Sequence, residues 1–243
     1  AASDVYKRQD MIAFTPEAVS KLKVKKVILG ADPWLFNKLN EQRRWKSSSE
    51  LYSYWKERIN AKDKNRKSQS FLSLKVPEST RSWIQNFYAR INTSSLVADN
   101  DGHEAVAKRT YDGRHIYRHQ IAHRSQPEIE DGFNKALGYS MTKYEHDASA
   151  KRDFISLLNW LKAQGVQVSL ALTPYHPKLH DRMMTEELMY PKVETEFRKI
   201  GRKLGVRVLG SYDARVVGCE AEEFYDPMHP RGSCVRKVVV WKP

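Results

Sequence analysis

The chain has 243 residues, enough for one sizeable core, and 40% of them are hydrophobic and 11% aromatic. This composition excludes an intrinsically disordered protein. No run approaches the roughly 20 apolar residues that a membrane-spanning helix needs. The 42 Lys and Arg residues exceed the 29 Asp and Glu residues, giving a formal net charge of +13. Such an excess attracts polyanions such as nucleic acid, anionic lipid or acidic polysaccharide, without choosing among them.

The N-terminus has an unusual sequence. The first nine residues, AASDVYKRQ, contain no initiator Met and resemble translated adapter sequence, so we expect residues 1–9 to be non-native and fused to a truncated gene. A signal peptide or membrane anchor would then have been upstream. We therefore treat residues 10–243 as a single domain.

Two segments near the N-terminus have clear patterns. The sequence KVKKVILG, residues 23–30, is a short apolar run closed by glycine and predicts a buried parallel strand. The loop ADPWLFN follows the carboxyl end of that strand, where active sites of open α/β sheets collect. Residues 48–59 predict a helix with one apolar stripe.

The middle of the chain contrasts with its last hundred residues. Residues 61–147 show no lasting period and several Asp-Gly turn signals, so we expect an insertion or lid there. The patterns that follow predict a helix over 148–165, a strand over 166–174, a helix ending at Gly205 and a strand over 206–213. This alternation predicts an α/β domain with a mostly parallel sheet.

The strongest motif is FYDPMHP, residues 224–230, placed between the last strand and a short terminal helix. Asp226 and His229 are three residues apart, so one turn of backbone can direct the carboxylate to Nδ1 of the imidazole. Such a carboxylate fixes the tautomer and leaves Nε2 free to take a proton from a serine hydroxyl. Because D-x-x-H alone is common, a capping aspartate and a surface histidine are the alternative.

The strand, the D-x-x-H-P loop and the short helix together resemble the last block of the SGNH (GDSL-like) hydrolase superfamily. GADPWLFN and FYDPMHPRGSC resemble a bacterial extracytoplasmic branch linked to cell-surface polysaccharide modification. The resemblance covers residues 24–60 and 151–240 by pattern. It implies a three-layer α/β sandwich of the flavodoxin-like kind and a Ser-His-Asp mechanism in which Asp226 and His229 are catalytic.

The resemblance also indicates which parts of the family's active site this sequence lacks. The family's nucleophilic serine and its second block stand near the N-terminus, and we expect both to have been lost with their strands, leaving an inactive fragment. Gly30 and Asp32 occupy the place of the family's Gly-x-Asn-Asp block, in which the Asn helps to form the oxyanion hole. Asp32 departs from that pattern, because a carboxylate repels an oxyanion. An Asx-turn role in its own loop is the alternative.

Four further residues are weaker candidates. We expect Trp34, Asn37 and His176 to lie at the substrate cleft, although His176 could equally be a loop residue held between two prolines. Ser211 ends a predicted strand and could imitate a nucleophile turn, but it lacks the G-x-S-x-G elbow.

Cys219 and Cys234 flank the strongest motif with a separation of 15 residues. A disulfide closing a loop of that size would stabilise the fold by roughly 3 kcal/mol and would require an oxidising compartment. Two separate buried thiols are the alternative. The bonded form agrees with a periplasmic or extracytoplasmic protein.

The leading functional hypothesis is a serine esterase or O-acyltransferase that acts on acylated cell-surface glycans without a metal or other cofactor. The alternative is a non-catalytic module of the same fold that binds acidic polysaccharide or another polyanion. No helix-turn-helix spacing or aromatic–basic signature supports a nucleic-acid partner. Three histidines recur every four residues, but their Arg-rich setting favours a polar surface over a metal site: they are His115, His119 and His123.

Overall fold

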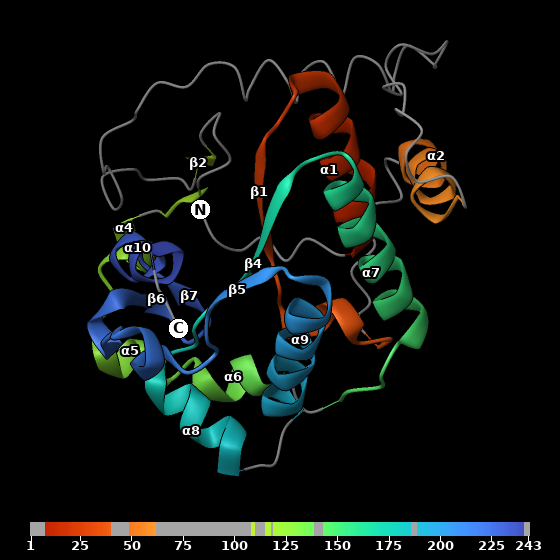
Figure 1. Ribbon diagram of the computed structural model, residues 1–243. Coiled ribbons are helices and arrows are strands. Elements are labelled where there is room, and N and C mark those ends of the chain that lie inside the picture. The colour runs from red at the N-terminus through yellow and green to blue at the C-terminus, as the bar shows by residue number, and fades with distance from the viewer. Residues whose placement is uncertain are drawn as a thin grey trace.

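The chain folds around a three-stranded parallel sheet with the strand order β1-β4-β5 (Figure 1). The computed structural model describes residues 8–39, 49–61, 108–109, 115–117, 119–138, 143–185 and 189–240. The strands are β1 (Lys26–Gly30), β4 (Gln167–Leu172) and β5 (Arg207–Gly210). The α/β class and the parallel sheet predicted from the sequence are therefore confirmed.

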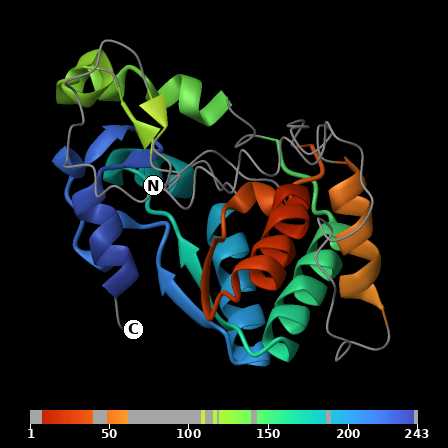
Figure 2. The same cartoon turned by 90° about the horizontal axis from the view of Figure 1, so that it is seen from above.

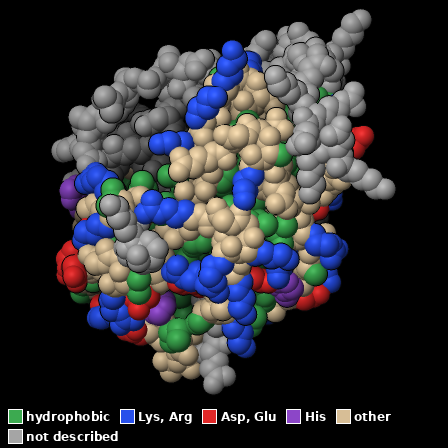
Figure 3. Space-filling view, viewed as in Figure 1, with side chains coloured by type: hydrophobic (Ala, Val, Ile, Leu, Met, Phe, Trp, Pro, Cys, Tyr) green, Lys and Arg blue, Asp and Glu red, His purple; other side chains and the backbone are tan. Residues whose placement is uncertain are grey.

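Helices cover the two faces of this sheet unequally. One face carries α1 (Arg8–Leu22), α2 (Ser49–Asn60), α7 (Ala148–Ala163) and α9 (Tyr190–Leu204), and the other carries α10 (Gly232–Val240), as Figure 2 shows. None of the described helices is long and apolar enough to cross a lipid bilayer. On the face drawn in Figure 3, Lys and Arg side chains gather over the region of α9.

Helix α7 shows how the sequence produces this packing. Phe154, Leu157, Leu158 and Leu161 recur at helical spacing, and each is 0% exposed because that stripe faces the sheet. The Asp147 side chain caps the helix by accepting a hydrogen bond from the Ala150 N–H at 2.8 Å.

Strand boundaries differ from those predicted, for a backbone reason. Strand β1 begins at Lys26 rather than residue 23, because Lys23 has φ +52°, a left-handed conformation that a strand cannot contain. Strand β5 ends at Gly210, whose φ is +74°. Helices α1 and α8 (Pro177–Thr185) were not predicted; α1 contains Pro16, and α8 is short and starts at a proline.

The outer side of β1 is an edge of the sheet within the described residues, because β4 is its only partner there. On this strand Ile28 is 51% exposed. The predicted α/β class is thus confirmed, whereas the described residues do not confirm the three-layer sandwich.

The expected insertion contains short elements where it is described. These are β2 (Lys108–Arg109), β3 (His115–Ile116), α4 (His119–Ala122), α5 (Gln126–Glu130) and α6 (Phe133–Gly138). Both ribbon views place α4 and α5 beside the hairpin of β6 (Phe224–Asp226) and β7 (His229–Pro230) (Figures 1 and 2). Residues 62–107, and most of the nine residues predicted to be non-native, lie outside the described residues.

Candidate active site

The FYDPMHP motif forms a tight hairpin that turns its aspartate toward its histidine. Strands β6 and β7 pair antiparallel, with Asp226 opposite His229. Oδ1 of Asp226 accepts hydrogen bonds from the backbone N–H of Met228 at 2.8 Å and of His229 at 3.0 Å. Oδ2 lies 2.7 Å from Nδ1 of His229. The geometry expected of an acid–base pair is thus confirmed.

The electrostatics of the hairpin keep Asp226 ionised. Burial by itself would raise the pKa of Asp226, but the hydrogen bond and positive charge of His229, with the two backbone N–H donors, outweigh it and lower the pKa. An ionised Asp226 accepts from a protonated Nδ1. In the neutral imidazole Nε2 is therefore unprotonated and available, and the His229 side chain is 27% exposed.

Asp32 provides a second carboxylate close to this pair. Burial raises the pKa of Asp32 to about 6, while a hydrogen bond with Thr173 and the charge of His229 act in the opposite direction. Asp32 stands at the N-cap of η1 (Pro33–Phe36) but makes no side-chain capping bond there. Its Oδ2 would lie 3.7 Å from a Cβ added to Gly30. The carboxylate therefore turns back over the end of β1, not into its own loop.

Hydrogen bonds join the loops that follow the three parallel strands. The Tyr212 hydroxyl donates to the Ala31 carbonyl at 2.5 Å, and the Tyr175 N–H donates to the Tyr212 carbonyl at 3.0 Å. The His176 N–H donates to the Pro227 carbonyl at 3.0 Å, which ties the motif loop to the end of β4. The Asp226–His229 pair is thereby held at the carboxyl edge of the sheet, where open α/β proteins bind their ligands.

His176 supports this loop from the interior. It is 0% exposed, and its ring packs against Phe133 and Phe224. Its Nδ1 accepts a hydrogen bond from the Lys178 N–H at 3.3 Å, so Nε2 carries the proton and donates to Oε1 of Gln126 at 3.1 Å. Burial lowers the pKa of His176, in agreement with a neutral ring. His176 is therefore a buried support and not an open cleft residue.

Asn37 and Trp34 also fail to support a cleft role. The two residues are only 6% and 7% exposed. Nδ2 of Asn37 donates to the Lys143 carbonyl at 2.9 Å, while Oδ1 accepts from the N–H groups of Leu39 and Glu145, each at 3.1 Å. The hydrogen bonds of Asn37 fix the loop after β1 against the segment before α7, and Trp34 is buried in the hydrophobic core.

Ser211 is engaged in a structural network. Its hydroxyl lies 3.0 and 3.1 Å from the two carboxylate oxygens of Glu194. The same carboxylate accepts from the Tyr212 N–H at 2.9 Å and from the Arg198 guanidinium at 2.6 Å. A hydroxyl that donates to an ionised carboxylate in a part-buried ion pair is poorly suited to be a nucleophile.

Two residues of the insertion reach the site and were not predicted. The Tyr117 ring lies 4.3 Å from the Tyr225 ring and 6.2 Å from the His229 ring, measured between centroids. A Cβ on Gly132 would lie 3.3 Å from Pro227, so the turn before α6 packs directly on the motif loop. The Asp131-Gly132 turn was visible in the sequence, but nothing in the pattern indicated what it touches.

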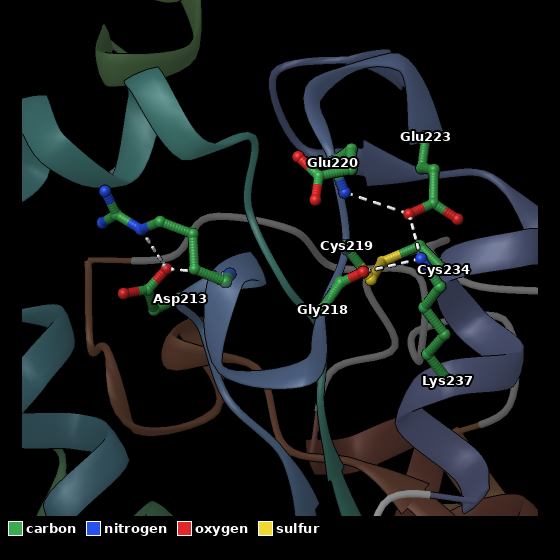
Figure 4. Close-up of a disulfide and its surroundings, with 8 residues drawn as sticks. Asp213, Gly218, Cys219, Glu220, Glu223, Cys234 and Lys237 are labelled. Atoms are coloured by element: carbon green, nitrogen blue, oxygen red, sulfur yellow. Dashed lines mark hydrogen bonds and ion pairs between the residues drawn. A yellow bond between two sulfur atoms is a disulfide. The ribbon is translucent and has the colours of Figure 1, made fainter.

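A disulfide closes the segment that carries the motif (Figure 4). Cys219 and Cys234 are bonded, with Cα atoms 5.3 Å apart, as predicted. The Lys237 ammonium binds the Gly218 carbonyl and the Glu223 carboxylate, each at 2.6 Å, beside the bond. Both ends of the loop that contains Asp226 and His229 are therefore covalently joined.

No family model, curated protein or solved structure matches the chain. The resemblance to SGNH hydrolases consequently depends on the residues of the chain alone. In the described side chains, no group of three or more His, Cys, Asp or Glu residues could hold a metal ion.

Proposed function

We propose that the chain is the acid–base half of an SGNH-type serine esterase or O-acyltransferase that acts on acylated cell-surface glycans. The observation that carries this proposal is the 2.7 Å contact between Nδ1 of His229 and Oδ2 of Asp226 at the carboxyl edge of a parallel sheet. An aspartate in that position orients the imidazole and stabilises its protonated form.

In the proposed reaction, Nε2 of His229 removes the proton of a serine hydroxyl as its oxygen attacks the acyl carbonyl of the substrate. The imidazolium then gives that proton to the leaving sugar oxygen, and an acyl-serine forms. Water or another sugar hydroxyl then attacks the acyl-serine carbonyl while Nε2 takes its proton, and the imidazolium returns that proton to the departing serine oxygen. Water would make the protein an esterase, and a sugar hydroxyl would make it an acyltransferase.

The proposal assigns the nucleophilic serine to a part of the gene product outside the 243 residues. Strand β1 is paired on one side only within the described sheet. A further parallel strand there would complete the proposed sandwich and end at the same edge as Asp32 and His229. Because parallel strands present their carboxyl ends together, a serine after that strand would face Nε2.

Asp32 has a different role in the proposal from the asparagine that the family carries. A carboxylate would repel a developing oxyanion. With a pKa raised to about 6, Asp32 is largely ionised at pH 7 and lies close enough to His229 to interact electrostatically with it. We assign it to stabilising the imidazolium that forms when His229 takes the serine proton.

The alternative, a non-catalytic module that binds an acidic polysaccharide, is favoured by one observation. A groove outside the candidate site is lined by four lysines and one glutamate. The two functions are compatible, because an enzyme acting on a charged polymer also needs a surface that holds it. The disulfide supports an extracytoplasmic location for either.

The test compares hydrolysis of p-nitrophenyl acetate by the 243-residue chain and by the complete product of its gene. We expect turnover only by the complete product, its loss in the His229→Ala variant, and labelling of one serine by a fluorophosphonate probe. Serine-dependent turnover by the 243 residues alone would contradict a nucleophile outside them. Turnover that survives His229→Ala would contradict the proposed mechanism.

A further inference from the structure

A groove of about 460 Å³ lies along α9 beside the first half of α7. We call it the α7–α9 groove and define it by Lys151 and Ile155 of α7 and by Lys192, Val193, Lys199 and Lys203 of α9. Its volume falls in the range of sites that bind small molecules or polymer segments. None of the residues of the candidate active site lines it.

The lining of the groove combines an apolar floor with a cationic rim. Val193 and Ile200 are buried and form part of the floor. The rim has four lysines and one glutamate, a balance of three positive charges. Figure 3 shows the same concentration of basic side chains over α9.

The single acid of the groove is already neutralised. Oε1 of Glu196 lies 2.5 Å from the Lys151 ammonium, and Oε2 lies 3.8 Å from Nδ1 of His146. The Tyr144 hydroxyl approaches the same His146 nitrogen at 3.4 Å. This cluster pairs the glutamate with Lys151 and leaves the other three lysines to set the charge of the groove.

Three lysines of α9 form a line of positive charge. Lys192, Lys199 and Lys203 are exposed, and no acid among the described residues pairs with them. They recur at i, i+7 and i+11, which is one side of a helix. Eleven residues at ~1.5 Å rise span about 16 Å. A line of charges of this length fits an extended polyanion better than it fits one small anion.

We propose that the α7–α9 groove binds a segment of an acidic polysaccharide, with sugar carboxylates on the lysines and sugar ring carbons on the apolar floor. The disulfide favours this polymer over nucleic acid, because it requires an oxidising compartment. The choice of a polysaccharide rests on the proposed function, but binding itself requires no catalysis.

The test measures binding of an oligogalacturonate to the 243-residue chain by isothermal titration calorimetry, with dextran as the uncharged control. The Lys192→Gln/Lys199→Gln variant is compared with Lys25→Gln/Lys26→Gln, which removes the same charge from exposed lysines outside the groove. We expect about fivefold weaker binding for the groove variant, from ~0.5 kcal/mol per exposed charge pair, and less than twofold for the control. Thermal unfolding confirms that both variants fold.

Several outcomes would overturn the groove as a polysaccharide site. These are equal weakening by both variants, equal binding of dextran, or no binding of oligogalacturonate. Lysine-dependent binding to phosphatidylglycerol vesicles in place of oligogalacturonate would assign the groove to a lipid surface instead. The His229→Ala variant should bind oligogalacturonate as tightly as the unmodified chain, so that failure of the catalytic proposal and failure of the groove remain distinguishable.

Discussion

Asp226 binds His229 with one carboxylate oxygen and the backbone of the intervening turn with the other. The turn that brings the two side chains together is therefore stabilised by the same group that orients the imidazole. Because one carboxylate does both, a spacing of three residues is enough to bring the two side chains into contact. A substitution of Asp226 can therefore change the orientation of the imidazole without disrupting the turn.

Replacing Asp226 by Asn should abolish most activity of the complete gene product while preserving the turn. The amide oxygen can still accept from the backbone, but the amide nitrogen cannot accept the Nδ1 proton and favours the other tautomer of His229. We expect kcat to fall about a thousandfold or more, with little change in KM, measured on an aryl acetate. A tenfold effect or less would mean that the pair is structural.

Replacing Asp32 by Asn should stabilise the protein at high pH. The folded state holds a proton on Asp32 up to about pH 6, whereas the unfolded chain releases it near 3.8. The folded state therefore binds more protons between these values, and stability decreases as pH rises through that window. At ~1.36 kcal/mol per pKa unit, the largest possible gain in the free energy of unfolding is about 3 kcal/mol. Because Asp32 is partly exposed, we expect a gain of about 1–2 kcal/mol.

Urea unfolding at pH 4, 6 and 8 checks this prediction. The gain from Asp32→Asn should be largest at pH 8 and vanish near pH 4. The matched control is Asp226→Asn, which should destabilise the protein at pH 6 and 8. The pKa of Asp226 is lowered in the folded state, so its ionised form stabilises the fold at any pH above the pKa of the unfolded chain. A pH-independent gain for Asp32→Asn would exclude a buried charge as the cause.

The sequence was most informative where local rules and tertiary packing agree. The helical stripe from Phe154 to Leu161 follows from two turns of helix, and the contact of Asp226 with His229 follows from one tight turn, so pattern alone located both. The disulfide could be proposed because two cysteines allow only one pairing.

Contacts distant in sequence could not be predicted in this way. His176 and Asn37 were expected at a cleft because polar side chains at strand ends often face ligands. Their partners, Gln126 and the 143–145 segment, are 50 or more residues away and lie in a region without periodicity. Polar residues buried by such partners have the same sequence signature as residues that bind substrate.

Replacing Ser211 by Ala should leave activity of the complete gene product within twofold of its original value. The hydroxyl binds Glu194, which keeps its bonds to Arg198 and to the Tyr212 N–H in the variant. Loss of the hydrogen bond to this carboxylate, and of the one that the hydroxyl accepts from the Asp213 N–H at 3.2 Å, should lower the free energy of unfolding by about 1–3 kcal/mol. Activity and urea unfolding are measured on the same variant. If Ser211 were the nucleophile, activity would be lost while the free energy of unfolding changed little.

Breaking the Cys219–Cys234 bond should loosen the hairpin that holds Asp226 and His229. The bond closes a loop of 15 residues around that hairpin, and in the chain-entropy model such a closure is worth roughly 3 kcal/mol. We expect the Cys219→Ala/Cys234→Ala variant to lose about 2–4 kcal/mol in urea unfolding. Dithiothreitol should destabilise the unmodified chain by a similar amount and leave the double variant unchanged. Equal sensitivity of both proteins to the reductant would show that the bond does not hold the fold, and would remove the structural argument for an oxidising compartment.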